Sequence, residues 1–112
     1  MALANADLEF KRGAIELLVL KSVSWGPMHG YAIARRIEQV ARGSLALNQG
    51  TIYPALLRLE QKGWISSKWG VSETKRRVRF FTITRAGLRQ LAAERRAWAR
   101  TVVMLNRLLE ES

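Results

Sequence analysis

The chain has 112 residues, of which 48% are hydrophobic and 25% charged, a composition typical of a single soluble globular domain. It contains no cysteine, so disulfide bonds and thiolate metal sites are excluded, and no apolar run approaches the roughly 20 residues that span a bilayer. Asp7 and Glu9, with no long apolar run near them, argue against a signal peptide, and we expect a cytoplasmic protein.

The charge is unbalanced and concentrated in one segment. Nineteen basic and nine acidic residues give a net charge of +10, and residues 64–85 hold six basic residues against one acidic residue, which is half of that excess. A focused basic excess favours a polyanionic partner, most commonly nucleic acid. The alternative is a basic surface that serves only solubility.

The first half of the sequence predicts short helices joined by tight turns. Residues 1–13 form an arm of mixed polarity, and the Leu- and Val-rich run 14–25 predicts a mostly buried helix that ends at Gly26-Pro27. A second helix is predicted over residues 31–42, where apolar residues recur at helical spacing. With a third helix after it, this is a helix-turn-helix arrangement.

His29, the only histidine, stands directly before the second helix. With no cysteine and no recognisable catalytic partner, it supports neither a zinc site nor acid–base chemistry, and we interpret it as a capping or turn residue. The sequence also lacks a glycine-rich phosphate loop and a nucleophile elbow. We therefore expect no enzymatic activity, no metal and no cofactor.

The third helix, predicted over residues 48–63, is the one on which function depends. Asn48 is the expected N-cap, Gly63 marks the end, and Pro54 fits only the early turns of a helix. Ile52 begins a buried stripe, which leaves polar side chains outward at the positive end of the helix dipole, where phosphate is favoured. The predicted DNA contacts of this helix are Asn48, Gln49, Thr51, Tyr53 and Arg58.

The alternative to these DNA contacts is that Tyr53 packs under the following hairpin and that Thr51 only caps its own helix. Tyr31 and Arg35, in the second helix, are predicted as further DNA contacts. For Arg35 and its neighbour Arg36, an exposed helical face without function is the alternative.

Residues 64–83 predict a β-hairpin with a basic loop. Residues 64–69 are rich in aromatic and hydroxyl side chains, residues 77–83 largely alternate in polarity, and the segment between them is polar. A cationic tip can contact backbone phosphate, and the alternative is a solvated loop that binds nothing. The tip residues predicted to contact DNA are Lys75, Arg76 and Arg77.

The last predicted helix begins after Thr84, its expected cap, and extends to about residue 111. Apolar residues recur in it with spacings of three and four, which is a heptad seam interrupted by Arg95. Such a helix extends roughly 40 Å, well beyond a small core, so we expect the seam to pack against a second copy of the chain. The predicted dimerisation residues are Leu88, Leu91, Trp98, Val102, Leu105 and Leu109.

Several motifs occur in the order found in one bacterial family. They include Leu17-Leu18-Val19-Leu20, Gly26-Pro27-Met28-His29-Gly30-Tyr31, Gly50-Thr51-Ile52-Tyr53-Pro54-Ala55-Leu56 and Thr84-Arg85-Ala86-Gly87. Over residues 13–98 the chain resembles the PadR family of transcriptional regulators. The resemblance implies a dimeric winged helix-turn-helix repressor of the short subgroup with a single C-terminal helix. Phe80-Phe81 departs from the family pattern, in which tyrosines are common.

Trp98 has two interpretations. It either fills the dimer interface or stacks on a flat aromatic effector, because indole is a good stacking platform and helical interfaces leave clefts. Relatives in the family respond to phenolic acids or planar drugs, which favours the second interpretation. Arg95 would then hold a carboxylate of the effector. The predicted apolar walls of that site are Leu17, Leu18 and Met104.

The sequence therefore predicts a mainly α-helical winged helix-turn-helix fold with a small β-hairpin. Residues 1–84 form the arm and the DNA-binding domain, and residues 85–112 form a dimerisation helix. The expected function is that of a homodimeric, ligand-responsive repressor on a pseudo-palindromic operator. The alternative is a winged-helix module that binds protein or RNA without specific operator recognition.

Overall fold

The structure, a computed structural model, describes residues 2–42 and 49–111. Four helices and three strands make up the described chain, in the order α1–β1–α2–α3–β2–β3–α4. The predicted mainly α-helical fold with a small hairpin and a long C-terminal helix is confirmed. The helices and strands have the bounds α1 Ala2–Val23, β1 Met28–His29, α2 Gly30–Ala41, α3 Gln49–Gln61, β2 Ile65–Val71, β3 Arg77–Ile83 and α4 Arg85–Glu110.

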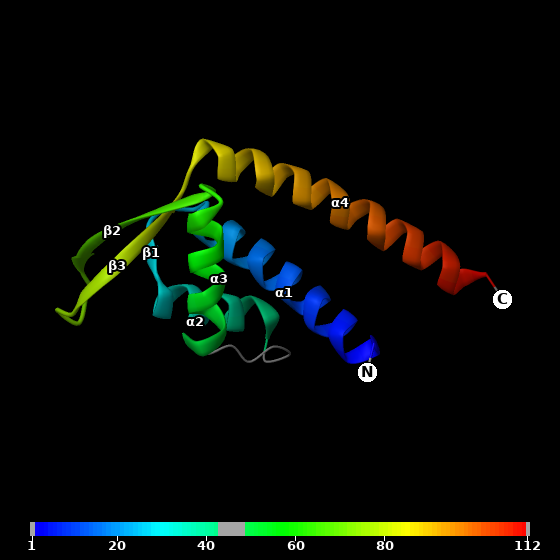
Figure 1. The fold of residues 1–112 in the computed structure, drawn as a ribbon, viewed down its shortest axis with the longest axis horizontal. Coiled ribbons are helices and arrows are strands. Elements are labelled where there is room, and N and C mark those ends of the chain that lie inside the picture. The colour runs from blue at the N-terminus through cyan, green and yellow to red at the C-terminus, as the bar shows by residue number, and fades with distance from the viewer. Residues whose placement is uncertain (1, 43–48, 112) are drawn as a thin grey trace.

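The elements form an elongated molecule with extents of 57 × 28 × 26 Å. α1, α2 and α3 pack together, the β2–β3 hairpin projects from one end, and α4 runs away from it toward the other end (Figure 1). The hairpin and the turn at residues 72–76 are called the wing below. The N-terminal end of α1 and the C-terminal end of α4 both extend beyond the core, on the side away from the wing (Figure 1).

One hydrophobic core joins all four helices to the sheet. Each element contributes its apolar face, as helical and strand periodicity require. Phe81 of β3 and Ile65 of β2 cover the helices from the sheet side, and Leu91 ties the start of α4 to the same core. The buried core residues are Val19, Leu20, Val23, Ile33, Ala34, Ile37, Ile52, Leu56, Leu59, Ile65, Phe81 and Leu91.

The predicted N-terminal arm is wrong, because α1 begins at Ala2 rather than near residue 14. Gly13 suggested a break, yet a single internal glycine costs a helix only about 1 kcal/mol, and the residues around it include strong helix formers. The strand β1 was not predicted either. This two-residue strand pairs with β3, with Met28 opposite Phe81 and His29 opposite Phe80, and it completes a three-stranded antiparallel sheet of order β1-β3-β2.

Both predicted caps that fall in the described chain are confirmed. His29 Nδ1 accepts a hydrogen bond of 3.3 Å from the Ala32 N–H at the start of α2. Thr84 Oγ1 accepts one of 3.0 Å from the Gly87 N–H and donates one of 2.6 Å to the Gly63 carbonyl. The cap predicted at Asn48 lies outside the described residues. Gly87 is required where it stands, because a Cβ there would collide with the Trp64 carbonyl.

Candidate nucleic-acid interface

α3 divides into a buried face and an exposed face. Ile52, Ala55, Leu56 and Leu59 are buried completely, as their helical spacing predicts. Turned away from them is an exposed row in which Tyr53 is 41% accessible and Leu57 45%. The members of this row are Gly50, Tyr53, Pro54, Leu57 and Gln61.

The predicted contacts of α3 occupy different positions relative to that row. Tyr53 lies in it, so part of its ring is accessible to a partner. Thr51 is half-buried at its edge, and Gln49 is the first residue of the helix. Because the N-terminal turn is the positive end of the helix dipole, it is the part of α3 best suited to phosphate.

Arg58 does not lie in the exposed row. Its Nε donates a 2.7 Å hydrogen bond to Glu16 Oε1 of α1, and Lys62 Nζ lies 3.7 Å from Glu16 Oε2. Arg58 therefore joins α3 to α1 through an ion pair that competes with the predicted DNA contact. A partner 42 residues away in the sequence leaves no local signal for this pairing.

The tip of the wing is a tight turn that presents cations. The Ser72 N–H donates to the Arg76 carbonyl at 2.8 Å, and the Lys75 N–H donates to the Ser72 carbonyl at 2.9 Å. Lys75 has a φ of 62°, so the turn projects its side chain from a left-handed position. All three predicted phosphate contacts, Lys75, Arg76 and Arg77, are exposed. The guanidinium of Arg77 lies 4.7 Å from the centre of the Trp69 ring.

A polar cluster fixes the base of the wing against α3, and sequence reasoning missed it. Arg79 Nη2 of β3 donates to Glu60 Oε1 at 2.8 Å and to Glu60 Oε2 at 3.0 Å, and it also contacts Ser67 Oγ of β2. Ser67 in turn donates to Glu60. Because the two charged side chains are only about a quarter exposed, this cluster constrains the angle between wing and helix.

The strand register shows which wing side chains share the face of that cluster. Alternate residues of a strand lie on the same side, and Phe81 and Ile65 of this side are in the core. Ser67 pairs with Phe81, Trp69 with Arg79 and Val71 with Arg77, so these residues continue the core face outward along the wing. Trp69 is 57% exposed and Val71 67% exposed. Trp69 is thus a candidate contact that the sequence analysis did not single out.

α2 supplies a second cationic and aromatic surface. Tyr31 is 59% exposed, its ring lies 6.5 Å from that of His29 at an interplanar angle of 12°, and the Arg35 guanidinium lies 5.9 Å from its centre. Arg36 lies instead 4.2 Å from the ring of Trp25. A groove of about 1020 Å³ separates this surface from the wing, and its lining includes Tyr31, Arg35, Arg36, Arg76 and Phe80.

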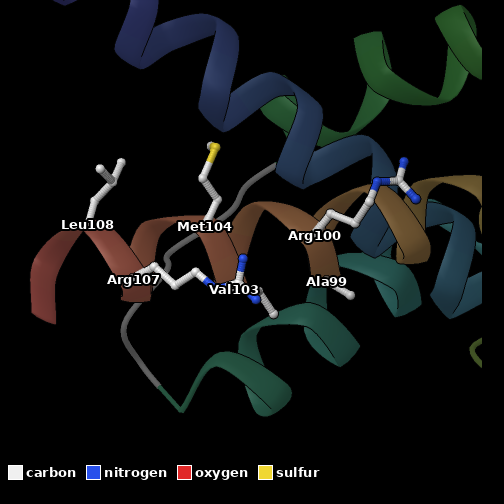
Figure 2. Close-up of a pocket in the computed structure, with 6 residues that line it drawn as sticks. All are labelled: Ala99, Arg100, Val103, Met104, Arg107 and Leu108. Atoms are coloured by element: carbon white, nitrogen blue, oxygen red, sulfur yellow. The ribbon is translucent and has the colours of Figure 1, made fainter.

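The structure does not gather the predicted effector residues into one pocket. Leu17 and Leu18 pack on the core, Trp98 is half-buried, and Arg95 is exposed. Of the predicted set, Met104 alone lines the cavity of about 580 Å³ on α4, where it points toward α1 beside Leu108 (Figure 2). The other residues lining that cavity are Ala99, Arg100, Val103 and Arg107.

The predicted dimerisation residues also separate into two groups. Leu91 is 6% exposed and belongs to the core of the protomer, which contradicts its assignment to a subunit interface. Leu88, Val102, Leu105 and Leu109 are exposed by 45% to 82%. Val103, Met104 and Leu108 are exposed as well, so the C-terminal half of α4 carries more uncovered apolar surface than the seam alone.

The described residues hold neither a metal-binding cluster nor a membrane-spanning helix. No group of three or more His, Cys, Asp or Glu side chains within residues 2–42 and 49–111 is arranged to hold a metal ion. Over the same ranges, no helix has the length and apolar character needed to cross a membrane.

Three packed helices, a recognition-type third helix and a cationic wing beside it define the chain as a winged-helix DNA-binding protein. A model described as the transcriptional regulator PadR-like family matches residues 19–93, and the chain belongs to this family. The resemblance in the motifs is thereby confirmed. Membership identifies a non-enzymatic transcriptional regulator of a family that binds DNA.

Individual relatives agree with this assignment. The transcriptional regulator Rv3488 of Mycobacterium tuberculosis is 34% identical over 89 residues, which cover 80% of this chain and 79% of that protein. An uncharacterized 37.1 kDa protein in a Streptomyces fradiae transposon is 41% identical over 85 residues. That match covers 76% of this chain, and the chain spans only 23% of the length of that protein.

Solved structures have the same fold. A transcriptional regulator from Clostridium thermocellum has a TM-score of 0.82 and 27% identity, covering 91% of this chain and 99% of that one. A PadR family regulator from Eggerthella lenta has a TM-score of 0.77 and 28% identity, covering 99% of this chain and 95% of that one. α4 is therefore part of the shared fold as well as the DNA-binding region.

Proposed function

We propose that this chain is a homodimeric repressor that binds a pseudo-palindromic operator and is released by a small effector. The observation that carries the proposal is the exposed row of α3 with Tyr53 at its N-terminal half, beside a wing whose tip presents three cations. Polar groups at a helix N-terminus suit base edges, and cations on a loop suit phosphates. The exposed Trp69 ring lies on the face of the wing that continues the core.

The exposed apolar side chains in the C-terminal half of α4 support a homodimer. Leu109 is 82% exposed and Leu108 61% exposed, a degree of exposure that isolated chains rarely tolerate over a continuous surface. In a symmetric dimer the two recognition helices would enter successive major grooves about 34 Å apart. Sedimentation of the wild type and of Leu109→Lys tests this. A dimer that the substitution dissociates supports the proposal, and a monomeric wild type contradicts it.

For the effector, Trp98 remains our proposed stacking platform in the dimer, with Arg95 as the partner of a carboxylate. A ligand that prefers a dimer whose two recognition helices are wrongly spaced for the operator lowers the affinity of the protein for DNA. By linkage, DNA lowers the affinity of the protein for the ligand by the same factor. A hydroxycinnamic acid is a suitable first probe. Saturable quenching of Trp98 fluorescence, with DNA and probe each weakening the binding of the other by the same factor, supports the site. No change with a panel of planar aromatic acids refutes it.

A competition experiment separates a DNA repressor from the alternative RNA-binding or protein-binding module. A labelled duplex from the region upstream of the protein's own gene is bound and then challenged with unlabelled duplex, its single strands, an RNA duplex and poly-glutamate. We expect displacement by the same duplex at the lowest concentration. Equal displacement by RNA or poly-glutamate identifies a general polyanion surface and contradicts operator recognition.

A further inference from the structure

One face of α4 carries a row of arginines that neither the DNA-binding surface nor the predicted seam uses. The members are spaced by 4, 7, 4 and 7 residues, which at 100° per residue places them within an arc of about 60°. The row extends over 22 residues, or about 33 Å of helix. We call it the arginine row, and it consists of Arg85, Arg89, Arg96, Arg100 and Arg107.

The row is exposed, and acidic residues lie beside it only at its C-terminal end, where Glu110 and Glu111 follow Arg107 by three and four positions. All five side chains are accessible, and no ion pair within the described part of the chain involves any of them. Glu94 lies about 140° round the helix from Arg89, and it accepts a hydrogen bond from Gln90. The other four arginines have no acidic neighbour on this face, and like charges on one helix repel one another, which favours an external polyanion.

The predicted dimer seam does not cover this face. Trp98 and Leu105 lie about 160–180° round the helix from Arg89. A dimer formed through that seam alone therefore leaves Arg89 and Arg96 accessible, whereas Arg100 and Arg107 line the cavity on α4 with Val103 and Met104. The row also differs from the DNA-binding surface, because α4 runs along the long axis of the molecule, away from the wing and α3 (Figure 1).

The chemistry of the row favours phosphate over a protein surface. Protein interfaces are held by large apolar or aromatic anchors at their centre, whereas between Arg85 and Arg100 this face carries only Ala92 and Ala93, and Val103 follows beyond them. Guanidinium groups match phosphate oxygens in a bidentate geometry, and every cation of the row is arginine. The length of the row is close to one turn of B-form duplex, about 34 Å.

We propose that the arginine row binds the phosphate backbone of a second segment of duplex DNA, distinct from the half-site contacted by α3 and the wing of the same subunit. This inference rests on the proposed DNA-binding function. The second segment is either flanking DNA that bends back along α4 or a separate duplex. Contacts of this kind add affinity and compaction without sequence preference, because phosphates carry no base identity.

The test uses two duplexes that contain the same binding site from the upstream region. One is about 25 base pairs long and the other about 60, so that only the longer one extends several ~34 Å helical turns beyond the site. Arg42→Gln and Arg96→Gln form a matched pair, because both arginines are exposed and only Arg96 belongs to the row. Arg89→Gln/Arg96→Gln gives a larger change. The ratio of the affinity for the long duplex to that for the short duplex is compared between variants. The longer duplex offers more non-specific binding positions to every variant, and this effect cancels in the comparison.

We expect Arg42→Gln to keep the wild-type ratio and the double variant to reduce it by roughly three- to tenfold at low salt. The slope of log K against log salt on the long duplex should become shallower by about 0.9 for each phosphate that the variant no longer neutralises. An unchanged ratio and slope in the double variant overturns the inference. Failure of the wild type to bind even the short duplex contradicts the proposed function instead.

A capture experiment distinguishes the two sources of the second segment. The wild type is bound to an immobilised short duplex, and a second labelled duplex is added. Retention of the second duplex by the wild type, abolished in the double variant, assigns the row to a separate duplex. A length-dependent gain without retention assigns it to flanking DNA. If the row variants are impaired only in poly-glutamate binding, the face belongs to an acidic protein and the inference fails.

Discussion

The contact between wing and recognition helix gives a prediction that the structure makes quantitative. Glu60→Gln removes the carboxylate that Arg79 Nη2 contacts at 2.8 and 3.0 Å, and leaves a guanidinium that is only 25% exposed with a weaker partner. Exposed pairs contribute up to about 1 kcal/mol, and breaking buried pairs costs about 3–5 kcal/mol. For this partly exposed pair we expect a decrease of roughly 1–2 kcal/mol in the free energy of unfolding.

The assay is urea denaturation followed by tryptophan fluorescence at a fixed protein concentration, since a dimer makes the midpoint concentration-dependent. Glu38→Gln is the matched control, because it removes an exposed carboxylate of α2 that lies outside both the wing and the core, and it should shift the midpoint little. A double-mutant cycle with Arg79→Gln should give a coupling energy of about 0.5–1.5 kcal/mol. Strictly additive effects, or equal midpoints for Glu60→Gln and Glu38→Gln, would refute the reasoning.

Four further substitutions follow from the packing. Gly87→Ala forces a Cβ against the Trp64 carbonyl and should lower the thermal midpoint by several degrees, and an unchanged midpoint would contradict that contact. Leu91→Ala should cost about 2–4 kcal/mol in unfolding free energy, whereas Leu109→Ala should instead weaken self-association measured by sedimentation; the reverse pattern would contradict their assignment. Arg58→Gln should lower the free energy of unfolding by up to about 1 kcal/mol, because it leaves Glu16 without this partner. It should leave the slope of log K for DNA against log salt unchanged, and a slope shallower by about one would instead identify Arg58 as a phosphate contact.

The parts of the fold that could be predicted from the sequence are those with a local signal. The stripe of α3, the alternation of β3 and the cap at Thr84 each follow from residues within a few positions of one another. The prediction of an N-terminal arm failed because Gly13 was interpreted as a break, although the surrounding propensities carry the helix through it.

The remaining errors concern contacts between distant residues. β1 is two residues long and exists only through its pairing with Phe80 and Phe81. The pairing of Arg58 with Glu16, 42 positions earlier, had no local signal, and Leu91 was assigned to the seam because a heptad pattern does not distinguish the core from a partner. The polar cluster of Glu60, Ser67 and Arg79 had no local signature of any kind.

The central claim is that α3 recognises bases while the wing tip contacts phosphates, and the salt dependence of DNA binding tests it most directly. Fluorescence anisotropy on the upstream duplex compares the wild type with Thr51→Ala/Tyr53→Ala and with Lys75→Gln/Arg76→Gln. If about eight phosphates are neutralised, the wild-type slope of log K against log salt is near −7. We predict that the α3 variant binds more weakly at every salt concentration with an unchanged slope, and that the wing variant has a shallower slope by about 0.9 per charge in contact. Two variants that bind as the wild type does, or an α3 variant whose defect disappears at high salt, would contradict base recognition by this helix.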